Sequence, residues 1–287
     1  MSGHAGLVLV ATPIGNMGDL SPRAAEELAA AGVIACEDTR RTGRLLSLAG
    51  IAGKELVVVN EHTEAEAAPR LVARIGAGER VVLVTDAGTP AVADPGERLV
   101  QAAADAGCTV SIVPGPSAPL AAVAVSGLTS GRFVYEGFLP RRGVARAVRL
   151  TELAASDRAV VLLEAPHRCA RTAADLVESF GPSRRAVAVR ELTKLHEEIW
   201  RGTLAGLARW ADSGLKGELV LVIEGASPPA PPTDRDVAEA LEAARAGDPE
   251  SSVRDLTSAV AGALGVSRRR VYEVARKPAP RPETGGG

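Results

Sequence analysis

The sequence contains few aromatic residues: seven of its 287 residues are Phe, Trp or Tyr, whereas 46% are hydrophobic. The core must therefore be built from aliphatic side chains, and the composition argues against an aromatic platform that stacks nucleic-acid bases. The chain also lacks an excess of positive charge, since its net charge is −2 and its isoelectric point is about 6.2. A protein that relied on non-specific contact with phosphates would be more basic, so any basic surface has to be local.

Cysteine and histidine are scarce and scattered. The three cysteines, Cys36, Cys108 and Cys169, form no CxxC pair, and their odd number argues against a disulfide framework. We expect buried thiols in a protein of the reducing cytoplasm. The four histidines show no metal-ligand spacing, which predicts no bound metal. The N-terminal segment has no basic region and only a short apolar run, so we expect neither a signal peptide nor a membrane span.

Short apolar runs alternate with amphipathic helical patterns through the first part of the chain. Continuous apolar strands between such helices are typical of a parallel sheet that is covered on both faces. Ser21 followed by Pro22 is typical of a helix start, because serine caps the helix and proline is tolerated in its first turn. The expected strands are Leu7–Ala11, Val33–Cys36, Leu56–Val59, Arg80–Thr85 and Val110–Val113, and the expected helices are Arg23–Ala31, Thr39–Leu48, Ala65–Ile75, Gly96–Ala106 and Ser117–Val125.

A second α/β segment follows residues 127–131, a stretch that we interpret as a hinge. Its last three strands lack the long helical spacers of the first part, which predicts a mixed or partly antiparallel sheet. Beyond a stiff Pro-rich linker we expect a helical appendage and then a disordered tail. The fold class is thus α/β, with a parallel-sheet domain (1–128), a mixed-sheet domain (129–226), the linker (227–233), a helical domain (234–277) and the tail (278–287). The second-domain strands are expected at Phe133–Tyr135, Ala159–Leu163, Ala186–Val189, Glu197–Trp200 and Glu218–Ile223, and the appendage helices at Asp234–Ala246, Val253–Ala263 and Arg268–Arg276.

Three loops that follow strands of the first sheet combine glycine with proline. They are residues 11–16, residues 85–90 with their continuation through 94–96, and residues 113–117. Ligands of open parallel sheets bind beyond the carboxyl ends of the strands, where glycine permits close backbone approach and proline fixes the turn. Any one loop is equally well explained as a tight turn, but three at one edge favour a ligand site whose main-chain groups read a nucleoside. No GxGxxG or GxxxxGK[ST] motif follows a strand, which argues against a phosphate-cradling nucleotide site.

Charged residues follow three of the expected strands, in the stretches 36–41, 164–168 and 190–194. A solvated strand end or a helix cap explains each stretch when it is taken alone. Their shared position just after apolar strands suggests that they converge on one cleft.

These stretches carry a resemblance to a known family. The segments ATPIGNMGDLSPRA, ACEDTRRTGRLL, VTDAGTPAVADPG, VPGPSA, FVYEGFLPRRG, EAPHR, VRELTKLHEE and KGELVLVIEG resemble, in order and spacing, those of the bacterial 16S rRNA (cytidine 2′-O)-methyltransferases of the tetrapyrrole-methylase superfamily. The resemblance covers about residues 7–225. The stretch from DAGTP to DPG resembles the family signature, and EGFLPRRG and RELTK resemble this branch rather than relatives that methylate porphyrin precursors.

The resemblance implies two α/β domains with S-adenosylmethionine, the methyl donor, held in the cleft between them. It also implies methylation of the ribose 2′-oxygen of a cytidine in the decoding centre of 16S rRNA, a substrate assembled in the small (30S) ribosomal subunit, and a homodimer. Carried over onto this sequence, the residues that hold the methyl donor are Asp86, Gly88, Thr89, Pro90, Ala91, Pro116, Ser117 and Ala118, and the Thr12 and Pro13 loop faces the reacting centre.

A ribose hydroxyl loses its proton when it is methylated, so a nearby carboxylate or imidazole would help as a base. The sequence leaves the choice of base open. The candidates are Glu37, Asp38, Glu191 and His167. The candidates for holding phosphates on either side of the target ribose are Arg40, Arg168 and Lys194.

The helical appendage resembles a helix-turn-helix, with Arg268, Arg269 and Arg270 at the start of its second helix. From Ser251 to Lys277 there are six Lys or Arg against two Asp or Glu, a local net charge of +4, which suits contact with RNA. A small helical bundle with a solvated basic face is the alternative.

Two other functions stay open at the level of sequence. Methylation of a carbon of a tetrapyrrole precursor predicts a cleft sized for a macrocycle and no use for a basic appendage. A ribosome-binding factor that has lost catalysis predicts binding of S-adenosylmethionine without methyl transfer, or neither.

Overall fold

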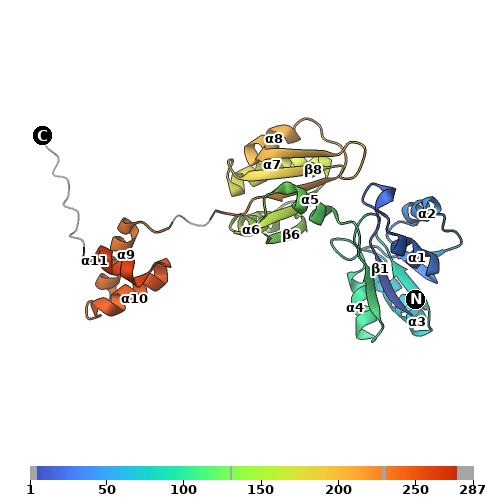
Figure 1. The fold of residues 1–287 in the computed structure, drawn as a ribbon, viewed down its shortest axis with the longest axis horizontal. Helices are drawn as coiled ribbons and strands as arrows, with labels where there is room; N and C mark the ends of the chain where they lie inside the picture. Colours follow the sequence, from blue (N-terminus) through green and yellow to red (C-terminus); the bar gives the residue numbers. More distant parts are fainter. Residues whose placement is uncertain (1–4, 130, 228–230, 277–287) are drawn as a thin grey trace. The chain divides into compact units, whose positions relative to one another are not determined.

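The computed structural model describes residues 5–129, 131–227 and 231–276. The described residues form two compact units, one within 1–226 and the other within 227–287 (Figure 1). The first unit contains two five-stranded sheets with covering helices, and the second contains helices only. The tail expected at 278–287 and part of the linker expected at 227–233 lie outside the described residues.

The first sheet is parallel throughout, with strand order β3-β2-β4-β1-β5. Alternate residues of β1 enter opposite cores: Leu7 packs with Leu71 and Leu99 on one face, whereas Val8 packs with Leu28 on the other. Burial on both faces is the reason that these strands are continuously apolar. The bounds are β1 Gly6–Val10, η1 Met17–Asp19, α1 Pro22–Ala30, β2 Val33–Cys36, α2 Thr39–Leu48, β3 Glu55–Val58, α3 Glu64–Gly76, β4 Arg80–Leu83, α4 Glu97–Asp105 and β5 Val110–Val113.

The second sheet is mixed, with order β6-β7-β10-β8-β9. β6 and β7 are parallel, β10 is antiparallel to β7 and β8, and β8 is antiparallel to β9. The expected α/β fold, with one parallel and one mixed sheet, is therefore confirmed. The bounds are α5 Ala118–Ser126, β6 Phe133–Phe138, α6 Val144–Ala154, β7 Ala159–Glu164, α7 Pro166–Phe180, β8 Arg185–Arg190, β9 Glu198–Thr203, α8 Leu204–Ala211 and β10 Leu219–Ile223.

Two details differ from the sequence-based expectation. β6 runs three residues beyond Tyr135, because a bulge with Gly137 in a left-handed conformation (φ +71°) shifts the register and lets pairing continue. In addition, α5 packs on the second sheet, where Ala122 lies among Val161 and Val187, although the expected first domain extended to residue 128. The small residues of α5 allow this close approach to the strands.

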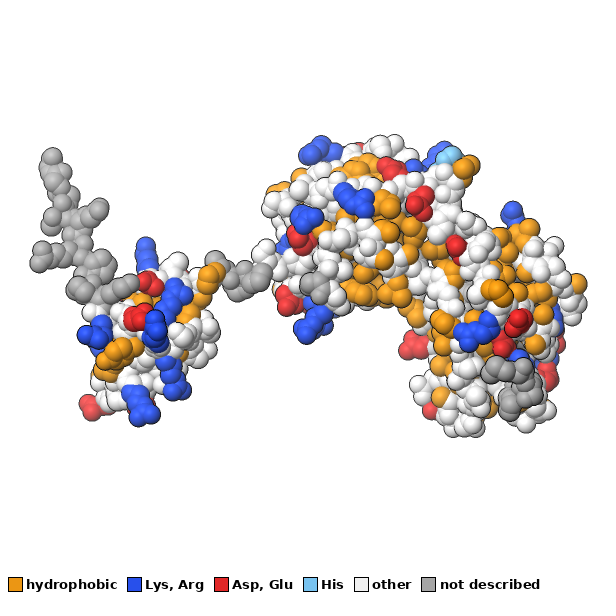
Figure 2. Space-filling model, viewed as in Figure 1, with side chains coloured by type: hydrophobic (Ala, Val, Ile, Leu, Met, Phe, Trp, Pro, Cys, Tyr) orange, Lys and Arg blue, Asp and Glu red, His pale blue; other side chains and the backbone are white. Residues whose placement is uncertain are grey.

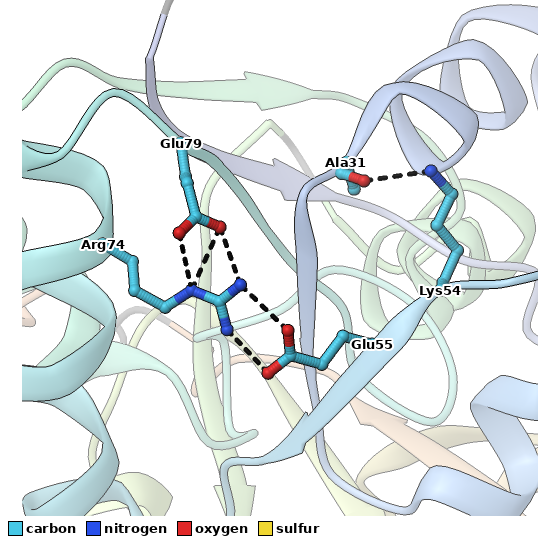
Figure 3. Close-up of polar contacts among 5 residues, drawn as sticks. All are labelled: Ala31, Lys54, Glu55, Arg74 and Glu79. Atoms are coloured by element: carbon cyan, nitrogen blue, oxygen red, sulfur yellow. Dashed lines mark hydrogen bonds and ion pairs between the residues drawn. The ribbon is translucent and has the colours of Figure 1, made fainter.

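One ion-pair network ties the first sheet to α3 at the end of the sheet where its strands begin. The Arg74 guanidinium contacts Glu55, at the start of β3, with Nη1···Oε1 2.7 Å, and Glu79, just before β4, with Nη2···Oε2 2.7 Å (Figure 3). Nearby, Lys54 Nζ donates to the carbonyl oxygen of Ala31 at 3.0 Å. Because parallel strands begin at this edge, the network lies opposite the edge where ligands bind, and we assign it to the fold.

The second unit packs three helices, α9 Asp234–Gly247, α10 Val253–Leu264 and α11 Arg268–Ala275. Its core contains Val237, Val260 and Val271. Gly265 ends α10 in a left-handed conformation, and the Ser267 hydroxyl accepts from the N–H of Arg270 to begin α11. The face of this unit in Figure 2 carries several Lys and Arg side chains.

Candidate active site

The three glycine- and proline-containing loops form one continuous rim beyond the first sheet. An isolated antiparallel bridge joins Thr12 to Gly88: each N–H donates to the other's carbonyl oxygen, at 2.9 and 3.1 Å. The Thr12 hydroxyl donates to the carbonyl oxygen of Thr85 at 3.2 Å, and the Thr89 hydroxyl donates to that of Pro116, also at 3.2 Å. The main-chain groups of Gly88 are therefore engaged in the fold of the rim. Those of Ala87 and Thr89 make no such bond within the described part of the chain and stay available to a ligand.

Backbone strain concentrates in two loops of the first unit. Among the described residues, the non-glycine residues with positive φ are Ala91, Ala93, Glu191 and Thr193. Two lie between the Asp86 loop and α4, and two in the loop after β8. Strained conformations of this kind cost about 1–3 kcal/mol each and persist where the surroundings hold them, commonly at functional sites. The sequence predicts functional residues in both loops.

A cleft of about 380 Å³ lies where the rim of the first sheet faces the second sheet, a volume in the range of small-ligand sites. The loop after β1 approaches the loop after β8 so closely that a Cβ on Gly15 would lie 2.5 Å from Lys194 Cγ and 3.0 Å from the carbonyl oxygen of Leu192. The sequence-predicted residues that line the cleft are Glu37, Asp86, Gly88, Thr89, Ser117 and Ala118. Residues of the second sheet and its loops that line it include Tyr135, Phe138, Leu163, Glu164, Ala165 and Leu192.

Five carboxylate residues line the cleft, and three of them, Glu37, Asp86 and Asp94, come from the loops of the first sheet. Thr85 Oγ1 donates to Glu37 Oε2 at 3.3 Å, and Asp86 Oδ2 lies 3.4 Å from Arg41 Nε. Burial, and then the charge of Glu37, raise the pKa of Asp86. The same two causes raise the pKa of Asp94 to about 6. Asp86 Oδ1 is buried and accepts no hydrogen bond from any described residue, so it has an unused acceptor position at the cleft.

Asp94 is a site residue that sequence reasoning did not assign. It belongs to the VTDAGTPAVADPG segment, but only the fold shows that it lies beside Glu37 and Asp86. Glu64, also missed, orders this segment from α3, since its Oε1 accepts from the N–H groups of Gly96 and Leu99 at 3.1 Å each. A carboxylate at the start of α4 is favourable there because the first turn of a helix leaves its N–H groups free.

A second cavity of about 790 Å³ adjoins the cleft and is strongly acidic. It shares Glu37, Asp86, Asp94 and Phe138 with the cleft. Two further predicted site residues, Asp38 and Ala91, line this cavity but not the cleft. The Asp38 carboxylate caps α2 and pairs with the exposed Arg40 (Nη2···Oδ2 2.7 Å), and the hydrogen bonds from Arg40 hold the Asp38 pKa well below its usual range. Asp38 and Arg40 therefore neutralise one another.

Glu191 and Lys194 lie together, but they bind each other and line none of these cavities. Lys194 Nζ is 2.9 Å from Glu191 Oε1 and 3.0 Å from Glu218 Oε2. The N–H of Glu218 also donates to Glu191 Oε1, and this bond followed by that from Lys194 lowers the pKa of Glu191. Glu191 is thus a weak base, and Lys194 already has two carboxylate partners.

The remaining predicted residues occupy three places. His167 and Arg168 line a third cavity, of about 860 Å³, together with four further arginines. Thr12 and the prolines Pro13, Pro90 and Pro116 shape the rim without lining the cleft. Arg268, Arg269 and Arg270 lie at the start of α11 in the helical unit, where Arg269 pairs with Glu273 and Arg270 donates to the carbonyl oxygen of Pro232 at 2.5 Å.

Within the described ranges, no helix combines the length and apolar character that crossing a bilayer requires. No cluster of three or more His, Cys, Asp or Glu there has the geometry to hold a metal ion.

Comparison of the sequence with known proteins identifies the family of this chain. Residues 6–208 match the model of the Tetrapyrrole (Corrin/Porphyrin) Methylases. The chain is 44% identical over 282 residues to "Ribosomal RNA small subunit methyltransferase I" of Mycobacterium tuberculosis (strain CDC 1551 / Oshkosh), an alignment that covers 98% of this chain and 97% of that protein.

Solved structures share the fold at lower identity. The methyltransferase CobJ matches with a TM-score of 0.60 and 22% identity, over 77% of this chain and 95% of its own. Uroporphyrin-III C-methyl transferase from Thermus thermophilus, complexed with S-adenyl homocysteine, matches with a TM-score of 0.55 and 22% identity, over 76% of this chain and 96% of its own.

Proposed function

The chain belongs to the tetrapyrrole methylase family, and we propose that within it the protein is an S-adenosylmethionine-dependent methyltransferase of small-subunit ribosomal RNA. The observation that carries the proposal is the 44% identity, over nearly the whole of both chains, to a ribosomal RNA small subunit methyltransferase I. The finer proposal is methylation of the ribose 2′-oxygen of a cytidine in the 16S decoding centre, in the cytoplasm, by a homodimer.

The cleft fits the methyl donor on two structural grounds. Asp86 lines the cleft, and its buried Oδ1 has no hydrogen-bond partner among the described residues, which leaves an acceptor for a ligand hydroxyl or ammonium group. The adjoining carboxylates Glu37 and Asp94 favour a cationic ligand, because opposite charge stabilises it where water is partly excluded. When bound, S-adenosylmethionine supplies a methyl group made electrophilic by its sulfonium.

The protein's task is then to align the ribose oxygen with that methyl group and to accept the hydroxyl proton. Alignment in favourable systems supplies about 7–11 kcal/mol, and a base adds about 10²–10⁴-fold. Of the four base candidates, Glu37 lines the cleft, whereas Asp38 and Glu191 are held by cations and His167 lines the arginine cavity. We therefore assign the role of the base that accepts the ribose hydroxyl proton to Glu37, whose carboxylate the Thr85 hydroxyl orients.

We also propose that the helical unit contacts RNA through the start of α11. Arg268 makes no ion pair within the described residues and stays available, whereas Arg269 and Arg270 have carboxylate or carbonyl partners. A chain that ends after Pro232 should then lose affinity for the small subunit while keeping its affinity for S-adenosylmethionine. Unchanged subunit affinity would remove this role.

The proposed function is tested by incubating the protein with labelled S-adenosylmethionine and undermethylated small ribosomal subunits. Nuclease digestion and mass spectrometry should place the label on the ribose of one 16S cytidine. Label on a base, or no label on subunits alongside transfer to a tetrapyrrole, would overturn the proposal. Light scattering of the same preparation should give twice the chain mass if the homodimer is correct.

A further inference from the structure

We propose that the arginine cavity binds the phosphates of the RNA backbone next to the target nucleotide, so that the RNA enters the cleft from this side. The inference deepens the proposed function and rests on it. The cavity is defined by its basic lining: Arg141, Arg142, Arg146, His167, Arg168 and Arg171. No Asp or Glu lines it.

The arginines divide into a fixed pair and a free set. Arg146 is 4% exposed and is held by Asp175 (Nε···Oδ2 2.7 Å), the Thr172 hydroxyl and the carbonyl oxygen of Pro140. Arg168 pairs with Glu164 and donates to the carbonyl oxygen of Leu139. These two shape the wall, and their charge is already largely balanced.

Arg141, Arg142 and Arg171 are exposed, and no described residue accepts a hydrogen bond or forms an ion pair with any of them. A single exposed arginine does not usually destabilise a protein. Three arginines that line one cavity without a carboxylate repel one another. Their planar guanidinium groups match the oxygens of a phosphate in a bidentate manner. A phosphate ligand would satisfy all three.

Two helices begin at the same cavity and add to its positive potential. α6 begins at Val144, just after Arg141 and Arg142, and α7 begins at Pro166, just before His167. The N–H groups at a helix start point outward and carry partial positive charge, so they favour an anion there. Side-chain and main-chain charges therefore act in the same direction.

The location connects this cavity to the cleft. Phe138 and Ala165 line both, and Phe138 is 54% exposed. Phe138 also lines the acidic cavity, whose lining has seven carboxylate residues against one arginine. A polyanion is repelled by the acidic cavity and attracted by the basic one, so charge alone fixes the side from which RNA approaches.

The test compares the full-length protein with a double variant, Arg141→Ala with Arg171→Ala. The matched control is Arg132→Ala with Arg158→Ala, two exposed arginines just before β6 and β7 that line none of the three cavities. Binding to undermethylated small subunits is measured over a series of KCl concentrations, and affinity for S-adenosylmethionine is measured by calorimetry.

We expect the cavity variant to bind subunits at least tenfold more weakly. Its salt dependence (log K against log salt) should become shallower by about 1.4 to 1.8, as expected for the loss of two phosphate contacts. S-adenosylmethionine affinity and thermal stability should not change, and Arg141→Lys with Arg171→Lys should recover part of the binding. The control variant should behave as wild type.

The inference is overturned if wild type methylates subunits but the cavity variant keeps its affinity and salt slope, or if the control loses as much. It is also overturned if the cavity variant loses affinity for a polycarboxylated tetrapyrrole and not for RNA. If wild type neither binds nor methylates subunits, the proposed function itself fails, and that result is visible before any variant is made.

Discussion

Asp94 gives the sharpest physical prediction, because its burial near two other carboxylates should destabilise the folded protein at neutral pH. Its pKa is raised from 3.8 to about 6 by burial, and then by the charge of Glu37. The folded state thus holds the Asp94 proton more tightly than the unfolded state does. The stability that the protonated form confers is present below pH 3.8 and is lost as the pH rises through 6.

The size of the effect follows from the shift. About two pKa units at 1.36 kcal/mol each give an upper bound of about 3 kcal/mol, and screening by solvent at this partly open cleft reduces it to about 1–2 kcal/mol. Asp94→Asn removes the charge and leaves the size and shape of the side chain nearly unchanged. The variant should therefore be more stable than wild type at pH 8, with a melting temperature about 2–8 °C higher, and the difference should disappear near pH 4.

The assay is thermal and urea unfolding of both proteins at pH 4, 6 and 8. The control is Asp157→Asn, which changes an exposed carboxylate that forms no ion pair within the described ranges, and whose stability difference should be small at all three pH values. The prediction is refuted if the Asp94→Asn protein is less stable than wild type at pH 8, or if the stability difference between the two proteins is the same at all three pH values.

Three other substitutions test the cleft. Asp86→Ala should weaken S-adenosylmethionine binding about tenfold to hundredfold in calorimetry, because it removes Oδ1, a buried acceptor that no described residue uses; normal binding would exclude Asp86 from the donor site. Glu37→Gln should lower turnover about 10²–10⁴-fold in single-turnover assays at unchanged donor affinity, and a smaller loss would show that alignment alone suffices. Gly15→Ala should lower the free energy of unfolding by about 1–3 kcal/mol in urea and raise the KM for subunits, because its Cβ would meet the loop after β8. The control Gly43→Ala, in open space on α2, should stabilise the protein slightly. Equal effects of the two substitutions would contradict the close approach.

The sequence was sufficient for the order of the elements because local patterns determine them. Val33–Cys36 and Thr39–Leu48 occur with the expected bounds, since an uninterrupted apolar run and a capped amphipathic pattern each leave little choice. The antiparallel pairing of β8 with β9 followed from the short spacer between them, but the expected lack of helical spacers before the last three strands holds only there, because α7 precedes β8 and α8 precedes β10. The structural role of Gly137 could not be predicted, because a glycine after an apolar run is compatible both with a bulge and with the end of the strand.

The site was predictable in its loops but not in its pairings. Glycine and proline mark the rim, yet the Thr12–Gly88 bridge joins residues 76 positions apart, and no local pattern shows that it occupies the amides of Gly88. Lys194 was expected to hold a phosphate, but Glu218, from a distant strand end, completes its pairing. The arginine cavity is assembled from two separate segments, 138–146 and 165–172, so only the fold shows that their charges add.

The central claim is that the cleft between the two sheets holds the methyl donor next to Asp86 and Glu37. A crystal structure of the protein with S-adenosylhomocysteine tests it most directly. We predict that the ligand lies in the cleft, with Asp86 Oδ1 accepting one of its hydrogen bonds and its sulfur facing Glu37. A ligand bound elsewhere on the molecule, with the cleft unchanged, would contradict the account.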